Sequence, residues 1–217
     1  MSASCCPPQH NRGDNQGSPT DGRFRRVLWI ALLVNAAMFV IELATAQTAS
    51  SAALLADSVD FLGDAINYAL SLFVLSLSLV TRARVAWLKG LSMLLFGLWV
   101  IGQAAWHAWS GVVPEATTMS VVGALALAAN LGVAALLFAH REGDSNRRSV
   151  WLCTRNDAIG NVAVLAAAAG VFGTGTGWPD VIVAGVMAVL ALHSGWQVVR
   201  LAVREMRGGA VAPAPAE

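Results

Sequence analysis

Charged residues are scarce in this sequence. Asp, Glu, Lys and Arg make up 12% of its 217 residues, whereas 56% are hydrophobic, and the mean hydropathy is +0.60. A soluble domain of this length carries about a quarter charged residues, so the composition excludes an ordinary soluble domain. The net charge is +1 and no basic stripe is present, which argues against nucleic acid as a partner.

Clusters of cysteine and histidine are also missing. Of the three cysteines, Cys5 and Cys6 are adjacent and Cys153 is distant in the chain, so a disulfide framework is excluded. No H-E-x-x-H motif or other His-rich cluster is present, which argues against a metal-dependent enzyme embedded in a membrane. We therefore predict no enzymatic activity and no prosthetic group.

Apolar residues instead fall in blocks about as long as a helix that crosses a bilayer, which needs about 20 residues. The blocks are 27–47, 52–80, 86–109, 118–139, 150–172 and 179–200. The first resembles a signal peptide, but its long polar lead and the five further blocks favour a retained helix. We predict an all-α, polytopic membrane protein with six transmembrane helices over 23–205. The polar segments 1–22 and 206–217 are predicted to be disordered tails.

Basic residues lie almost entirely on one side of this predicted topology. Thirteen of the fourteen Lys and Arg residues lie near the two chain ends, or in or near the second and fourth connections between blocks. They are Arg12, Arg23, Arg25, Arg26, Arg82, Arg84, Lys89, Arg141, Arg147, Arg148, Arg200, Arg204 and Arg207. By the positive-inside rule this side is cytoplasmic, so both termini are predicted to be inside. We expect a multi-pass protein of the lipid bilayer, in a bacterial inner membrane.

Three aspartates interrupt the second apolar block. Asp57, Asp60 and Asp64 are spaced by three and four residues, which places them on one face of a helix. A charged side chain at the bilayer centre costs about 2.5–3.5 kcal/mol on insertion scales, so such acids indicate function. The alternative is pairing with basic side chains, but Arg155 is the only one placed inside another block. We predict that Asp60 and Asp64 bind a cation, and that Asp57 caps the helix or lies at an entrance.

The fifth block supplies the second half of the predicted site. Cys153 and Asp157 are four residues apart and Asn161 is four further on, so they share one helical face. Two pairs at this spacing, on facing helices, form a four-ligand site. Carboxylates and a thiolate suit zinc-like ions in tetrahedral geometry. We predict Asp60, Asp64, Cys153 and Asp157 as metal ligands, with Asn156 as an alternative to Cys153.

Two further acids have weaker patterns. Glu42, in the first block, either lines the outer end of a pathway or is a packed acid. Asp180 follows Pro179 at the start of the sixth block, where an N-cap or first-turn position is expected.

The run SSAALLADSVDFLGDAINYALSLFVLSLSL resembles the second helix of cation diffusion facilitator transporters, with Asp60 and Asp64 as its metal-binding pair. WLCTRNDAIGNVAVLAAAAGVF and GWPDVIVAGVMAVLALHSGWQVVRLAV are similar to that family's fifth and sixth helices. The resemblance covers about residues 25–205. It implies efflux of divalent metal cations from the cytoplasm in exchange for protons, by a homodimer with one site per protomer. Transported zinc-like ions (Zn, Cd, Co, or also Fe or Mn) and protons are the expected partners.

The sequence departs from the family's pattern at two places. The family usually has His four residues before the aspartate of the fifth helix, where this chain has Cys153, so the choice of ion is open. Many members continue into a soluble cytoplasmic domain, whereas about a dozen residues follow the sixth block here. We therefore expect a short form without that domain, dimerising through membrane helices. The alternative functions are a proton or cation channel, or a non-transporting metal-binding subunit.

Overall fold

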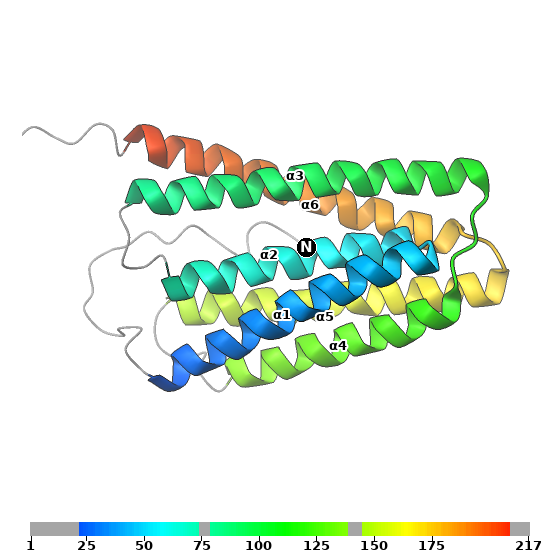
Figure 1. The fold of residues 1–217 in the computed structure, drawn as a ribbon, viewed down its shortest axis with the longest axis horizontal. Helices are drawn as coiled ribbons and strands as arrows, with labels where there is room; N and C mark the ends of the chain where they lie inside the picture. Colours follow the sequence, from blue (N-terminus) through cyan, green and yellow to red (C-terminus); the bar gives the residue numbers. More distant parts are fainter. Residues whose placement is uncertain (1–21, 74–78, 139–144, 209–217) are drawn as a thin grey trace, which may run out of the picture.

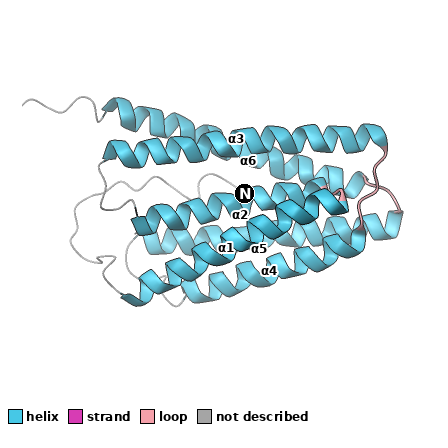
Figure 2. Ribbon diagram, in the orientation of Figure 1, coloured by secondary structure: helices cyan, strands magenta, loops and turns pink. Residues whose placement is uncertain are grey.

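The computed structural model describes residues 22–73, 79–138 and 145–208; the side chains of 73, 79, 80, 82, 145–156 and 208 are left out of the description. Six α-helices account for nearly all of these residues, and no strand occurs among them (Figures 1 and 2). The helices are α1 (Gly22–Ala49), α2 (Ala52–Phe73), α3 (Leu79–Ser110), α4 (Ala116–Phe138), α5 (Ser145–Thr174) and α6 (Trp178–Gly208). The predicted all-α class is confirmed. Most of the two predicted tails lies outside the described ranges.

Five of the described helices are long and apolar enough to cross a membrane. They are α1, α4, and the stretches Ala83–Ser110 of α3, Asp157–Thr174 of α5 and Trp178–Arg207 of α6. The remaining helix, α2, carries Asp57, Asp60 and Asp64 but has 22 residues, about 33 Å at 1.5 Å per residue. This length also matches a hydrocarbon core of about 30 Å. The protein is therefore an integral, multi-pass membrane protein.

Successive helices run in opposite directions (Figure 1). The start of α1 and the end of α6 consequently lie at the same end of the bundle, which we call the inner end. The short connections at 50–51, 111–115 and 175–177 lie at the opposite, outer end. This alternation agrees with an even number of crossings.

Helices α3 and α6 form the most extensive pair, and they lie along one side of the other four (Figure 1). Helix α2 contacts α1, α3, α5 and α6. It is therefore the central element of the bundle, and its polar face is surrounded by protein instead of lipid.

Two predicted features of this region were wrong. The apolar block 52–80 is not one helix, because Leu79 already belongs to α3. A continuous apolar run contains no signal for where one helix ends. Lys89, assigned to the cytoplasmic connection, lies within α3 and its side chain is buried. Arg155 is therefore not the only basic residue inside a helical span.

Glycines allow α3 and α6 to approach closely. A Cβ atom added at Gly90 would lie 2.7 Å from Val199 Cγ2 and 3.0 Å from the carbonyl oxygen of Gly195. A Cβ atom at Gly195 would in turn lie 3.0 Å from the Gly90 carbonyl oxygen. Small residues at such crossings let two backbones pack directly, which is a common way to associate helices in membranes.

Gly90→Ala is expected to destabilise the protein by about 1–3 kcal/mol, because the added methyl group overpacks the α3–α6 contact. Gly102→Ala, on the same helix, is the matched control, since no atom lies within 4 Å of its added Cβ. Thermal unfolding in detergent, followed by helical circular dichroism, measures both. Equal midpoints for the two variants would contradict the close approach described here.

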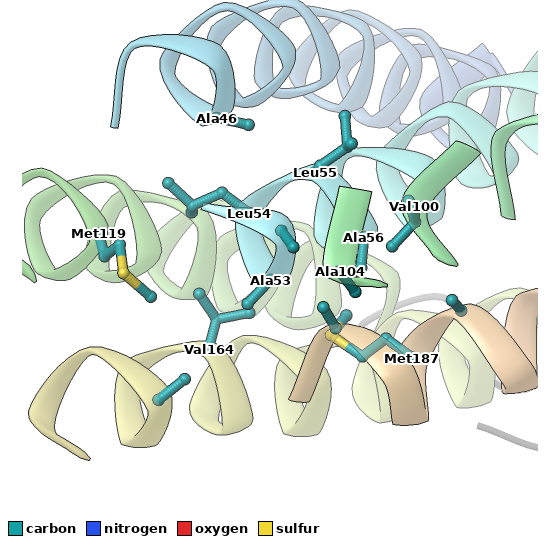
Figure 3. Close-up of a cluster of buried hydrophobic side chains, with 14 of the residues drawn as sticks. Ala46, Ala53, Leu54, Leu55, Ala56, Val100, Ala104, Met119, Val164 and Met187 are labelled. Carbon is teal, nitrogen blue, oxygen red and sulfur yellow. The ribbon is translucent and has the colours of Figure 1, made fainter. Parts of the chain in front are cut away.

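A buried apolar cluster closes the outer half of the bundle. Figure 3 shows part of it, with side chains contributed by all six helices. The residues labelled there include Ala46 of α1, Leu54 of α2, Val100 of α3, Met119 of α4, Val164 of α5 and Met187 of α6. Among the described side chains, a second cluster near the inner end draws on α1, α2 and α4. In the outer half, side chains of all six helices pack together.

Candidate metal centre

Asp64 of α2 and Asp157 of α5 form the centre of the candidate site. Their carboxyl groups lie within hydrogen-bonding reach of each other, across the α2–α5 contact. Asp64 is buried and accepts a hydrogen bond from the Tyr68 hydroxyl at 3.4 Å. Asp157 is half-buried, and its Oδ2 atom is buried without a hydrogen-bond partner. The carboxyl groups of Asp64 and Asp157 are therefore neighbours where α2 and α5 meet.

Asp60 lies one turn before Asp64, is half-buried, and its charge interacts with those of Asp64 and Asp157. Among the described side chains, however, no three His, Cys, Asp or Glu residues are close enough to hold one metal ion. The Cys153 side chain, the predicted fourth ligand, is among those left out of the description. Its backbone is in α5, one turn before Asp157. The structure thus brings Asp64 and Asp157 together, with Asp60 nearby.

A lysine that the sequence analysis missed faces this site. Lys89 of α3 donates a hydrogen bond to the Oδ1 atom of Asn67, which lies one turn after Asp64 on α2. Its charge interacts with those of Asp64 and Asp157. A signal was available, because Lys89 is the only lysine in the chain and lies inside the apolar block 86–109.

Buried amides extend the polar interior toward α4. The Nδ2 atom of Asn130 donates to the Oδ1 atom of Asn161 at 3.4 Å, and both side chains are buried. The sequence predicted Asn161 on the polar face of α5, but no role was predicted for Asn130. Asn130 is the only amide in α4 and lies between apolar residues, which is the pattern that could have identified it.

A second pair of carboxyl groups lies toward the outer end. Glu42 of α1 and Asp57 of α2 are fully buried and within hydrogen-bonding reach of each other. No amide, hydroxyl or ammonium group among the described residues donates a hydrogen bond to their four carboxylate oxygens. The prediction that Asp57 caps α2 was wrong, because Ala52 begins that helix and Asp57 lies more than a turn inside it.

The cap of α2 comes from a different helix. Asp180, in the first turn of α6 as predicted, accepts hydrogen bonds from Ser51 Oγ at 2.6 Å and from the backbone N–H groups of Ala52 and Ala53. The Ser51 hydroxyl also accepts from the N–H of Leu54 at 3.1 Å. A carboxylate on the first N–H groups of a helix satisfies donors that have no intrahelical partner. This contact joins α6 to the helix that carries the aspartates.

Asp180→Ala is expected to lower the free energy of unfolding by about 3 kcal/mol, because it leaves buried donors at the start of α2 unsatisfied. Glu115→Ala is the control: Glu115 is exposed, precedes α4 and accepts a hydrogen bond from Thr118. We expect this variant to lose less than about 1 kcal/mol. Unfolding of both in detergent gives the comparison, and equal losses would show that the Asp180 contact is not a major restraint.

Comparison with known proteins agrees with this architecture. Residues 28–206 match the family described as "Cation efflux transmembrane domain". The chain belongs to the cation efflux family. It is a transporter family, and the match covers the six helices nearly end to end. The family resemblance inferred from the two helix motifs is thereby confirmed.

Two individual relatives are more distant. One, from Bacillus subtilis (strain 168), is named "Cadmium, cobalt and zinc/H(+)-K(+) antiporter" and is 25% identical over 215 residues. Another with the same name, from Bacillus velezensis, is 24% identical over 203 residues. The alignments cover 92% and 87% of this chain but 66% and 64% of the relatives. This member of the cation efflux family therefore spans slightly less than two thirds of the length of these relatives.

Proposed function

We propose that this cation efflux protein moves divalent transition-metal ions of the zinc, cadmium and cobalt type out of the cytoplasm, in exchange for protons. The contact between the Asp64 and Asp157 carboxyl groups carries the proposal. Two acids held together inside an apolar bundle need a cation or protons to supply the missing positive charge. The names of the two antiporters support the class of ion.

Asp60, Asp64, Asp157 and Cys153 are the proposed ligands. Asp60 and Asp157 are half-buried. We infer that a rearrangement of α2 and α5 closes the four groups around one ion. Three carboxylates favour harder ions, whereas a thiolate favours zinc and cadmium, so a mixed set accepts several zinc-like metals.

Exchange for protons follows from the chemistry of these ligands. Carboxylates and thiols bind metal only after they lose their protons, so metal and protons compete for the same groups. A higher proton concentration outside would then release the ion there. The driving ion then needs no second binding site.

The packing of the bundle supports a direction for access. The outer half is closed by an apolar cluster from all six helices, while Asp60 and Asp157 remain partly exposed below it. We infer a state that receives ions from the inner end, which the distribution of arginines assigns to the cytoplasm. Glu42 and Asp57 are the acids an ion would meet next on an outward route. We also propose that the protein acts as a homodimer through its membrane helices.

The test is metal flux into proteoliposomes that contain a metal-sensitive dye. Transport should saturate with metal concentration and should accelerate when a proton gradient is imposed in the exchange direction. Flux that is linear in concentration and indifferent to pH would indicate a channel instead. Bound metal without any flux would indicate a metal-binding subunit that does not transport.

A further inference from the structure

The only lysine of the chain is held inside the bundle. Lys89 lies in α3 and is 8% exposed, whereas Leu88 beside it is 58% exposed. The next residue, Gly90, is in the closest part of the α3–α6 contact, which fixes the position of this turn of α3. Burial of a lysine is unfavourable unless its ammonium group is hydrogen-bonded and near opposite charge, so this position requires an explanation.

The ammonium group of Lys89 lies beside the candidate metal centre. Its ammonium group donates to Asn67 Oδ1, one turn from Asp64, and its charge interacts with those of Asp64 and Asp157. Helices α2 and α5 therefore supply the negative groups, and α3 supplies a positive group that faces both of them.

We propose that the ammonium group of Lys89 is a fixed counter-charge of the metal site, which sets how tightly the site holds its ion. The inference rests on the proposed function. When all four proposed ligands have lost their protons, the carboxylates of Asp60, Asp64 and Asp157 and the thiolate of Cys153 carry four negative charges. The ammonium group reduces this net charge to three, so a bound divalent ion leaves one uncompensated negative charge instead of two.

The fixed charge has a consequence for transport. Without it, the buried site would keep one more negative charge around the bound divalent ion, and the ion would be held more tightly because no positive group opposes it. A transporter must also release its ion on the far side. Lys89 therefore weakens binding to a level that permits release, and it does so without contributing a ligand.

The experiment compares zinc and cadmium binding by the full chain in detergent, measured by calorimetry, with flux in proteoliposomes. Lys89→Gln and Lys89→Met remove the charge, and Lys89→Arg retains it. Arg84→Gln is the matched control, because it removes an exposed charge from the same helix. Circular dichroism and size-exclusion chromatography identify any variant that fails to fold; two charge-removing variants guard against the loss of one.

We expect Lys89→Gln and Lys89→Met to bind metal about tenfold more tightly or better, and to turn over more slowly. Lys89→Arg and Arg84→Gln should stay within about threefold of wild type. Unchanged or weaker binding in folded Lys89→Gln would overturn the inference while leaving the proposed function intact. So would a Lys89→Arg variant that behaves like Lys89→Gln. Wild-type protein that neither binds nor transports metal would overturn both.

Discussion

Asp64→Asn abolishes saturable metal flux: this is the largest effect that we expect from a single substitution. Asparagine keeps the size of the side chain and an oxygen that can accept from Tyr68, but it removes the charge that a metal ion requires. Groups that only support a ligand typically contribute 10–100-fold to metal affinity, so loss of a ligand should reduce flux by about a hundredfold or more. Asp157→Asn should behave in the same way.

The double variant tests whether Asp64 and Asp157 act on the same ion. Because Asp64 and Asp157 act on the same ion, Asp64→Asn combined with Asp157→Asn should lose little more activity than either change alone. Glu115→Gln is the control, since it removes an exposed acid outside the site. All variants are measured in the dye-loaded proteoliposomes at matched protein content. Saturable flux retained by both single variants would rule out this pair as the binding site.

Cys153→His is expected to change the choice of ion more than the rate of transport. A histidine nitrogen can occupy the position of the thiolate in a tetrahedral zinc site, so zinc flux should remain within about threefold. Cadmium prefers sulfur, and replacement of the sulfur should lower its flux relative to zinc by about tenfold or more.

The measurement is a panel of zinc, cadmium, cobalt and manganese in the same flux assay. Cys153→Ser is the control, because a hydroxyl is close in size but a poor ligand, and it should lower flux for both zinc and cadmium. An unchanged zinc-to-cadmium ratio in Cys153→His would show that Cys153 is not a ligand, and would favour Asn156 in its place.

Much of the architecture could be predicted from the sequence. In a bilayer the helix is the simplest element that satisfies every backbone polar group, so long apolar blocks indicate both the class and the number of elements. The residues at which the helices begin and end were predicted less accurately. The boundary between α2 and α3 lies in a continuous apolar run, and α5 begins at Ser145, five residues before the predicted start at 150.

Features of the site that depend on spacing within one helix could be predicted. Features that depend on a contact between two helices could not. The spacing of Asp60 and Asp64 could be read directly from the sequence. The cap of α2 could not, because its acceptor, Asp180, lies 128 residues beyond Ala52 in the chain. Lys89 was missed because basic residues near a span were counted with the connections. This count serves the prediction of orientation, but it hides a lysine whose side chain is buried in the bundle.

X-ray absorption at the zinc edge tests the proposed site most directly, because it reports the atoms bound to the ion. Zinc bound to purified wild-type protein should show oxygen ligands at about 2.0–2.2 Å and one sulfur at about 2.3 Å. The sulfur signal should disappear in Cys153→His, and zinc itself should be lost from the Asp64→Asn, Asp157→Asn double variant. Stoichiometric zinc with an unchanged spectrum in that double variant would contradict the account.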